Sequence, residues 1–243
     1  MVQPLPQTVA DAFFRHQTLV FVSPHPDDVV WSCGGLVARA VAGGANARVV
    51  VVFDGGEDGS GAPSPRIAED RAALKILRAE RHSLGLTDAA LRQNCCGQRM
   101  YPNGLALRRC ERHPDDAVLE ELTRAVPATL EGADAVIAPL ARQTHIDHVL
   151  TRHAIEANRP PAMSVYYYQE FPYPDLAPGF AHERADIPVD TDLWLRASQC
   201  YRSQISATFG DPHRLKGDLL NRATARGARR PACTLYRRSR AAT

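Results

Sequence analysis

The segment His25–Asp28 places an imidazole and two carboxylates directly after an apolar run, and chemistry at a metal ion uses these residue types. The run, residues 18–22, is rich in β-branched and aromatic residues, and an apolar-periodic stretch follows the turn. Strand, polar turn and helix in this order are typical of the first βα unit of an α/β sheet, in which ligands bind at the carboxyl ends of the strands. The imidazole and one carboxylate suit a divalent metal such as zinc, and the other carboxylate would serve as a base.

The same four residue types recur at His113–Asp116 in a different context. Arginines precede this copy, and no apolar strand leads into it. Proline at the first position of a helix, with carboxylates in the first turn, favours a helix start. The second copy is therefore predicted to be a solvated helix N-terminus, and the first copy is predicted to carry the chemistry.

A second polar turn, His145–His148, follows another buried strand and leads into a helix. Its two histidines are three residues apart, which places them on one face of the helix. If both strands belong to one parallel sheet, the two turns open onto the same edge. The residues that would then converge are His25, Asp27, Asp28, His145, Asp147 and His148.

Alternating strand and helix patterns predict one three-layer, Rossmann-like α/β domain over residues 1–243, with a mostly parallel sheet and a disordered tail at 238–243. Its active site is expected at the carboxyl ends of the strands. The predicted strands are 18–22, 48–53, 135–138, 164–168 and, as an edge strand, 233–236. The predicted helices are 29–42, 66–82, 114–130, 149–158 and 189–203.

Composition restricts the class of partner. A net charge of +2 is too small to favour nucleic acid. No apolar run is long enough for a membrane span. The N-terminal residues lack the basic start and apolar core of a secretory signal, so we expect no secretion. We therefore expect a cytoplasmic protein that acts on a small molecule.

The six cysteines contain no CxxC pair and are expected to be reduced thiols. The role of Cys95 and Cys96, the oligomeric state, and whether segment 94–112 covers the active face stay open.

Taken together, the turns Pro24–Asp28 and His145–His148 resemble the (P/A)HPDD and HxDH turns of the LmbE-like, or PIG-L, zinc-dependent deacetylases. Arg66–Asp70 is similar to the R-x-x-E-D helix of that family. Residues 168–173 and 201–204 are similar to segments of one of its branches. The resemblance extends over most of the chain.

Some positions depart from the family pattern. Val29 stands where many members have Glu, and Arg142 and Gln143 replace glycines that are common before the HxDH turn. The C-terminal segment 231–234 lacks a Glu that many members carry. These differences leave the implied metal ligands in place and concern the shape and polarity of the substrate pocket.

The resemblance implies that His25, Asp28 and His148 hold zinc and leave a position for water, as catalytic zinc sites do. It implies that Asp27 is the general base that accepts the proton of this water as the water attacks an amide carbonyl. Histidine and carboxylate ligands also accept iron, cobalt and nickel, so other divalent transition metals stay open.

The resemblance further implies that His145 donates a hydrogen bond or a proton to the oxyanion or the leaving amine. Asp147 would orient His145 through its other ring nitrogen. On position alone, Arg66, Gln143 and Tyr168 are candidate substrate-binding residues. All of these residues except Gln143 have a purely structural alternative: a helix cap for His145 and Asp147, an exposed ion-pair face for Arg66, and a core aromatic for Tyr168.

The function expected from the resemblance is metal-dependent removal of an acetyl or short acyl group from an amine. The substrate would be a small N-acylated amino sugar, glycoside or natural-product intermediate. One alternative is a hydratase of a carboxylated unsaturated substrate, with Arg66 or Arg142 binding the carboxylates. A third hypothesis is an inactive metal-binding scaffold, which the presence of both Asp27 and His145 disfavours.

Overall fold

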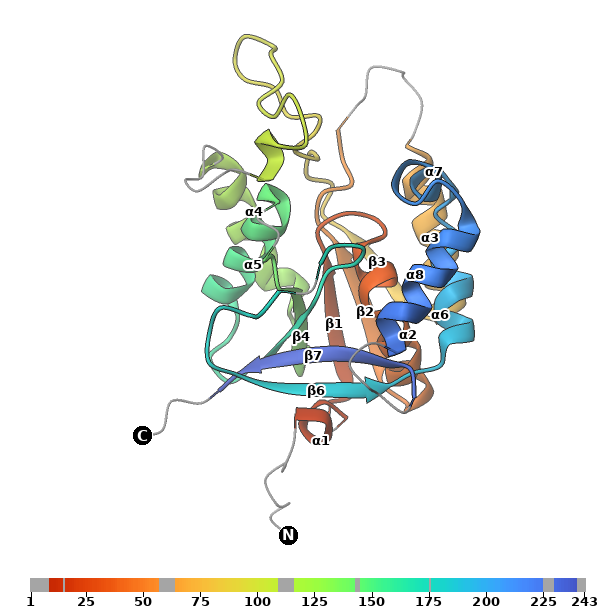
Figure 1. The fold of residues 1–243 in the computed structure, drawn as a ribbon. Coiled ribbons are helices and arrows are strands. Elements are labelled where there is room, and N and C mark those ends of the chain that lie inside the picture. The colour runs from red at the N-terminus through yellow and green to blue at the C-terminus, as the bar shows by residue number, and fades with distance from the viewer. Residues whose placement is uncertain are drawn as a thin grey trace.

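The computed structural model describes residues 9–14, 16–56, 64–108, 116–142, 145–174, 176–224 and 230–239. A seven-stranded sheet of order β3-β2-β1-β4-β5-β7-β6 forms its centre (Figure 1). The strands are β1 (Thr18–Ser23), β2 (Asn46–Val51), β3 (Glu80–Ser83), β4 (Ala135–Pro139), β5 (Ser164–Tyr168), β6 (His182–Pro188) and β7 (Ala232–Arg238). The strands from β3 to β5 in this order are parallel, and β7 is antiparallel to both of its neighbours. The predicted α/β fold with a mostly parallel sheet is confirmed.

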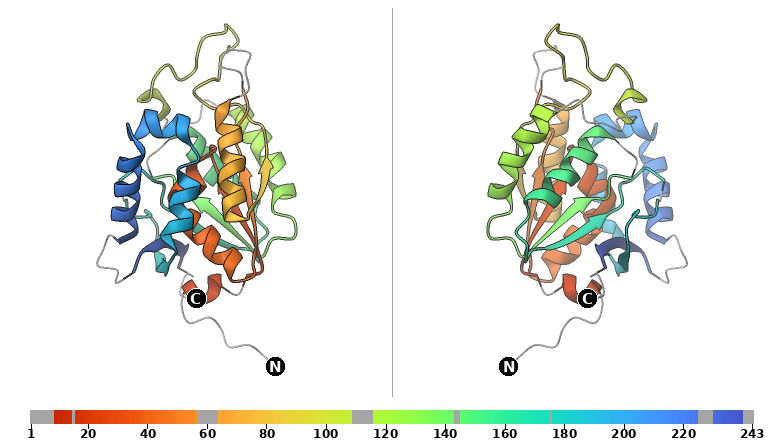
Figure 2. Two further views of the ribbon diagram at one scale, coloured as in Figure 1. Left: turned by 90° about the vertical axis from the view of Figure 1, so that its right-hand side faces the viewer. Right: turned by 90° about the vertical axis from the view of Figure 1, so that its left-hand side faces the viewer.

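Helices cover both faces of this sheet (Figures 1 and 2). One face carries α4 (Asp116–Thr129) and α5 (Ile146–Asn158). The other carries α2 (Asp28–Ala42), α3 (Pro65–Leu77), α6 (Thr191–Ser198), α7 (Arg202–Thr208) and α8 (Pro212–Thr224). The short α1 (Val9–Phe13) lies against β6 and β7, and the 3-10 helix η1 is Ala106–Arg108. In the described part of the chain, no helix combines the length and apolar character needed to cross a membrane.

The apolar strands build two cores, one on each face of the sheet. In β1, Leu19 and Phe21 belong to the core under α2, whereas Val20 and Val22 belong to the core under α5. Successive side chains of a strand point to opposite faces, so an uninterrupted apolar run serves two layers of helices. This explains why the central strands could be recognised in the sequence.

The region predicted as one helix over 66–82 contains a helix and a strand. Helix α3 ends at Leu77, because Arg78 adopts a left-handed conformation with φ of 56°. The following strand, β3, reads Glu-Arg-His-Ser and is mostly exposed. Among the described strands it pairs only with β2, and it forms one edge of the sheet. Its four residues show no alternation of apolar and polar side chains by which a strand could be recognised in the sequence.

The C-terminal region also differs from its prediction. Strand β7 lies between β5 and β6 and is not an edge strand, because β6, which the sequence pattern did not reveal, covers it. The helix predicted over 189–203 is divided into α6 and α7. Arg238 belongs to β7, so the predicted disordered tail begins too early, and residues 240–243 lie outside the described part.

The remaining boundaries agree closely with the sequence patterns. The second copy of the HPDD letters ends at Asp116, where α4 begins, and residues 113–115 lie outside the described residues. The segment after β3 rises above the carboxyl ends of the parallel strands, at the top of Figure 1. It returns to the fold through η1 and α4.

Helices α2 and α6 approach closely at a pair of glycines, which yields a stability prediction. A Cβ atom on Gly35 would lie 2.9 Å from both Trp194 Cε3 and Val189 Cγ2, whereas a Cβ atom on Gly217 in α8 would meet nothing within 4 Å. We expect Gly35→Ala to lower the free energy of unfolding by about 1–3 kcal/mol through overpacking. Gly217→Ala should raise it by about 0.5–1 kcal/mol. Urea denaturation measures both, and a Gly35→Ala protein as stable as the wild type would contradict the close approach.

Candidate functional site

The turn after β1 is held in shape by its own side chains. The Ser23 hydroxyl donates to the carbonyl oxygen of His25 at 2.6 Å and accepts from the N–H of Val29 at 3.1 Å. The Asp28 carboxylate accepts a hydrogen bond from the N–H of His25 at 2.8 Å. These bonds fix the side chains of His25 and Asp28 beside one another at the carboxyl end of β1.

Asp27 has a strained backbone. Its φ is 103°, a value that residues other than glycine rarely adopt. It is the N-cap of α2, and its carbonyl oxygen accepts the N–H of Trp31 at 2.8 Å. Such a conformation costs about 1–3 kcal/mol and persists where the surroundings impose it, often at active sites. In this conformation the largely buried Asp27 still lines the cavity described below.

The turn after β4 meets the turn after β1 because these two strands are parallel neighbours. The chain winds outward in opposite directions from this pair, and such a switch point is where α/β sheets bind ligands. His145 is the N-cap of α5, and its Nδ1 accepts the N–H of Asp147 at 3.3 Å. Asp147 and His148 follow in the first turn of this helix.

His25, Asp28 and His148 bring potential metal-ligand atoms within 4.8 Å of one another. Oδ2 of Asp28 lies 3.2 Å from Nδ1 of His25 and 3.3 Å from Nε2 of His148. All of these side chains are buried. Two imidazoles and one carboxylate leave a coordination position open, as a catalytic metal site requires.

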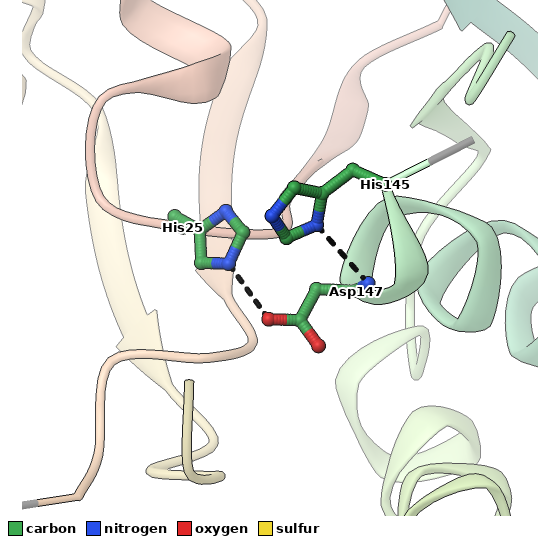
Figure 3. A group of neighbouring side chains, drawn as sticks. All are labelled: His25, His145 and Asp147. Atoms are coloured by element: carbon green, nitrogen blue, oxygen red, sulfur yellow. Dashed lines mark hydrogen bonds and ion pairs between the residues drawn. The ribbon is translucent and has the colours of Figure 1, made fainter. Parts of the chain in front are cut away.

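A second group of potential ligands, His25, His145 and Asp147, shares His25 with the first (Figure 3). An imidazole that binds a metal through one nitrogen donates the N–H of the other to an acceptor. Nδ1 of His25 faces Asp28, and its Nε2 lies 2.8 Å from Oδ2 of Asp147. The geometry therefore favours the first group as the ligand set, with Asp147 orienting His25.

The electrostatics of the cluster fit a divalent cation. In the described part of the chain, carboxylates outnumber guanidinium groups here: Asp27, Asp28, Asp88, Asp147 and Glu170 face Arg66 and Arg92. Burial lowers the pKa of His148, but the Asp28 and Glu170 carboxylates outweigh this effect and raise it to about 9. The local field attracts positive charge, and a metal bound between the imidazoles would supply it.

Asp147 does not orient His145 as expected. Its carboxylate accepts the N–H of Ala89 at 3.0 Å, pairs with the guanidinium of Arg92, and contacts His25. Only its backbone N–H reaches His145. The difference arises because His145 precedes the helix as its cap, whereas Asp147 lies in the first turn with its carboxylate against the turn after β1.

Glu170, Arg92 and Asp88 are members of the cluster that the sequence analysis did not identify. Oε1 of Glu170 lies 3.2 Å from Nδ1 of His148, which gives the second histidine a carboxylate partner as well. A signal for Glu170 was present, since it is an acidic residue among aromatic side chains directly after a buried strand. Arg92 and Asp88 lie in an irregular segment in which no periodic pattern singles them out.

Arg66 contacts the candidate base directly. Its Nη2 donates to Oδ2 of Asp27 at 3.0 Å and to the carbonyl oxygen of Pro26 at 3.1 Å. Its Nη1 lies 3.5 Å from Oδ2 of Asp88. Burial raises the pKa of Asp27 to about 7, against the opposing effect of the Arg66 charge. A carboxyl group with a pKa near neutrality can accept a proton from a reacting group and release it again.

His145 is placed as a neutral hydrogen-bond donor. Burial, together with the charges of His148 and His25, lowers the pKa of His145 to about 2. Because its Nδ1 accepts the N–H of Asp147, the ring proton lies on Nε2. His145 also lines the cavity, so this N–H can donate to a bound molecule.

A cavity of about 490 Å³ opens onto these groups. Leu107 lines it, so the long segment that follows β3 does contribute to the active face. Phe171 and Tyr173 line it from the loop after β5, and Gln204 and Thr208 from α7. Residues distant in the sequence thus enclose the cluster at the carboxyl edge of the sheet.

Of the candidate substrate-binding residues, Arg66 lines this cavity and Tyr168 does not. Tyr168 is fully buried, and its hydroxyl donates to the carbonyl oxygen of Val22 at 3.0 Å. Its alternative as a core aromatic of β5 therefore accounts for it better than contact with a substrate. Gln143 lies outside the described residues.

Comparison with known proteins yields one family match and one curated relative. The sequence model of the PIG-L family, described as GlcNAc-PI de-N-acetylase, matches residues 20–158. Over 181 residues the chain is 34% identical to a 2'-N-acetylparomamine deacetylase from Streptomyces fradiae. This alignment includes 69% of the chain and 61% of the relative, so the match spans less than two thirds of that protein.

Solved structures share the fold at low sequence identity. A teicoplanin deacetylase in its zinc-inhibited form superposes with a TM-score of 0.75 and 21% identity, covering 90% of this chain and 97% of that one. An N,N'-diacetylchitobiose deacetylase from Pyrococcus horikoshii superposes with a TM-score of 0.61 and 18% identity, covering 95% of this chain and 86% of that one. At such low identity, the superpositions establish the common fold alone.

The buried pair of Arg92 and Asp147 gives a prediction that separates it from surface ion pairs. Arg92→Met removes the guanidinium from a fully buried carboxylate, and we expect the free energy of unfolding to fall by about 3–5 kcal/mol. Arg184→Met, which removes an exposed ion pair with Asp186, should change it by less than about 1 kcal/mol. Urea denaturation of the two variants measures this contrast. Equal effects on the free energy of unfolding would show that the buried pair contributes no more to stability than the exposed pair.

Proposed function

The chain belongs to the PIG-L family, and we propose that it is a zinc-dependent N-deacetylase. It removes an acetyl or short acyl group from the amine of a small, sugar-containing metabolite or natural-product intermediate. One observation carries this proposal: in the candidate ligand set of His25, Asp28 and His148, the first two residues line the same cavity as a carboxyl base and a neutral imidazole donor.

The donor set supports zinc as the metal. Two imidazoles and one carboxylate suit its borderline character, and each imidazole is oriented by a buried carboxylate, Asp147 or Glu170. When bound, zinc would lower the pKa of a coordinated water molecule and polarise the amide carbonyl. Iron, cobalt and nickel are compatible with the same ligands.

Asp27 is the proposed general base. It lines the cavity beside the ligand Asp28, and its pKa of about 7 allows it to take the proton of the attacking water. Arg66 holds one carboxylate oxygen of Asp27 through the hydrogen bond from Nη2. This contact directs the carboxylate, so Arg66 has a positioning role at the base as well as a place in the cavity wall.

His145 is the proposed partner of the transition state. Its Nε2–H donates a hydrogen bond to the oxygen on which negative charge develops as the amide carbonyl is attacked. The contact from the N–H of Asp147 to Nδ1 fixes this tautomer without a carboxylate partner. As the carbon–nitrogen bond breaks, the proton held by Asp27 passes to the nitrogen, so that the leaving group departs as a neutral amine.

The substrate class follows from the relatives together with the cavity. The curated relative and the solved structures are named for acetylated paromamine, teicoplanin and diacetylchitobiose. The cavity combines carboxylates and a guanidinium with the aromatic wall formed by Phe171 and Tyr173. Such a mixed lining suits a polar ring with hydroxyl and amino groups.

The hydratase alternative receives less support. It needs arginines that are able to bind substrate carboxylates, and the sequence offered Arg66 and Arg142 for this purpose. The guanidinium of Arg66 is engaged by Asp27 and Asp88. Arg142 is exposed and is not among the residues that line the cavity. Deacetylation requires no substrate carboxylate and is therefore favoured.

Acetate release, followed by proton NMR, tests the reaction and the base together. The zinc-loaded protein is offered N-acetylated amino sugars and aminoglycosides. We expect Asp27→Asn to lower the rate about 10²- to 10⁴-fold while zinc stays bound, because asparagine tolerates the positive φ but cannot accept the proton. The control Asp192→Asn makes the same chemical change at an exposed helix start and should leave the rate unchanged. Equal rates for wild type and Asp27→Asn would exclude Asp27 as the base.

Removal of the metal provides an independent test. Dialysis against a chelator should abolish acetate release, and added zinc should restore it. Because zinc binds the folded state, the loaded protein should also be more stable, by about 2.7 kcal/mol at a free zinc concentration 100 times the Kd. Thermal unfolding with and without zinc measures this difference. Full activity in a protein shown to be free of metal would refute the proposed mechanism.

A further inference from the structure

The loop after β5 lies between the candidate metal site and α8. We call residues 169–173 the wall segment. Through Phe171, Pro172 and Tyr173 it lines the cavity, and through Glu170 it contacts the candidate ligand His148. The whole segment follows residue 158, where the match to the family model ends. Within the segment, the N–H of Phe171 donates to the Ser32 hydroxyl at 3.0 Å, and α8 contacts the segment from outside the region that the family model matches.

Arg222 of α8 holds the wall segment at both ends. Its Nη2 donates to the carbonyl oxygen of Gln169 at 2.9 Å, and its Nη1 donates to the carbonyl oxygen of Tyr173 at 3.1 Å. The guanidinium lies over the Phe171 ring, 5.7 Å from its centroid. A planar fork of donors can span two acceptors at once, which a single ammonium group cannot do in the same geometry.

Glu170 depends on this backbone for its position. Its side chain is fully buried, and Oε1 lies 2.7 Å from the N–H of Ala141 and 3.2 Å from Nδ1 of His148. Oε2 has no hydrogen-bond partner among the described residues. Only one of the two carboxylate oxygens is therefore held by these bonds, and a shift of the wall segment would withdraw it from His148.

We propose that Arg222 is a positioning residue for the metal site, which acts through the wall segment to keep Glu170 against His148. The proposal rests on the metal site of the proposed function. A carboxylate on the outer nitrogen of a metal-binding histidine fixes the tautomer that presents the other nitrogen to the metal. The order of action is Arg222, wall segment, Glu170, His148.

The competing explanation is that Arg222 only fastens α8 to the body of the fold. In that case its loss would reduce stability without a specific effect on metal binding. A double-mutant cycle separates the two explanations, because residues that act in series lose their effect when the later one is already removed.

The experiment measures the zinc Kd by competition with a chromophoric chelator, and the ligand-field spectrum of the Co²⁺-loaded protein. The variants are Arg222→Met, Arg222→Lys, Glu170→Gln and the double variant Arg222→Met/Glu170→Gln. Arg214→Met is the matched control, because Arg214 lies on the same helix in an exposed ion pair with Asp218. Thermal unfolding establishes that each protein is folded.

We expect Glu170→Gln to weaken zinc binding about 10- to 100-fold, as the loss of an outer partner of a metal ligand does. Arg222→Met should weaken it about 10-fold with an altered Co²⁺ spectrum, and Arg222→Lys by less. In the Glu170→Gln background, Arg222→Met should add less than about 2-fold, and Arg214→Met should leave the Kd unchanged.

Two results would overturn the proposal. One is a zinc Kd that stays within about 2-fold of the wild-type value, the smallest change that a double-mutant cycle resolves, for both Arg222→Met and Arg222→Lys. The other is full additivity of the Arg222 and Glu170 effects. If Arg222→Met does not fold, Arg222→Lys and its double variant with Glu170→Gln carry the same test. Acetate release is not needed for any arm, so a wild type that binds zinc without deacetylating would refute the reaction and not this proposal.

Discussion

The parallel pairing of β1 with β4 is the contact on which the functional centre depends. These strands are adjacent in the sheet although more than a hundred residues separate them, and their carboxyl ends deliver the His25–Asp28 and His145–His148 turns to one edge. Neither turn holds a complete ligand set. The apolar runs that bury both strands between two layers of helices therefore determine whether the polar groups meet at all.

Much of this centre could be read from the sequence, because its main parts follow strands with strong apolar patterns. The turn after β1 and the turn after β4 were both located in this way. The exposed strand β3 could not be recognised, since Glu80–Ser83 carries no alternation. The contact of Asp147 with His25 could not be recognised either, because it depends on how a helix N-terminus is set against a neighbouring turn, and sequence spacing does not specify that angle.

The two imidazoles of the candidate ligand set are supported in different ways. His25 is backed by Asp147, whose charge is matched by the buried guanidinium of Arg92. His148 is backed by Glu170, which is held by a backbone N–H and by the path of the loop that carries it. One ligand is therefore oriented by a local ion pair, and the other by the packing of distant C-terminal elements.

The aromatic wall of the cavity has a consequence for how this chain can diverge. The candidate ligands, the base and His145 all lie within residues 20–158, whereas Phe171, Tyr173, Gln204 and Thr208 come later. The chain order thus places the candidate reactive groups before much of the cavity wall, although Arg66 and Leu107 also line the cavity. Substitutions at Gln204 and Thr208 of α7 can reshape the entrance while the reactive groups and Glu170 stay unchanged, so related chains can exchange one ligand for another.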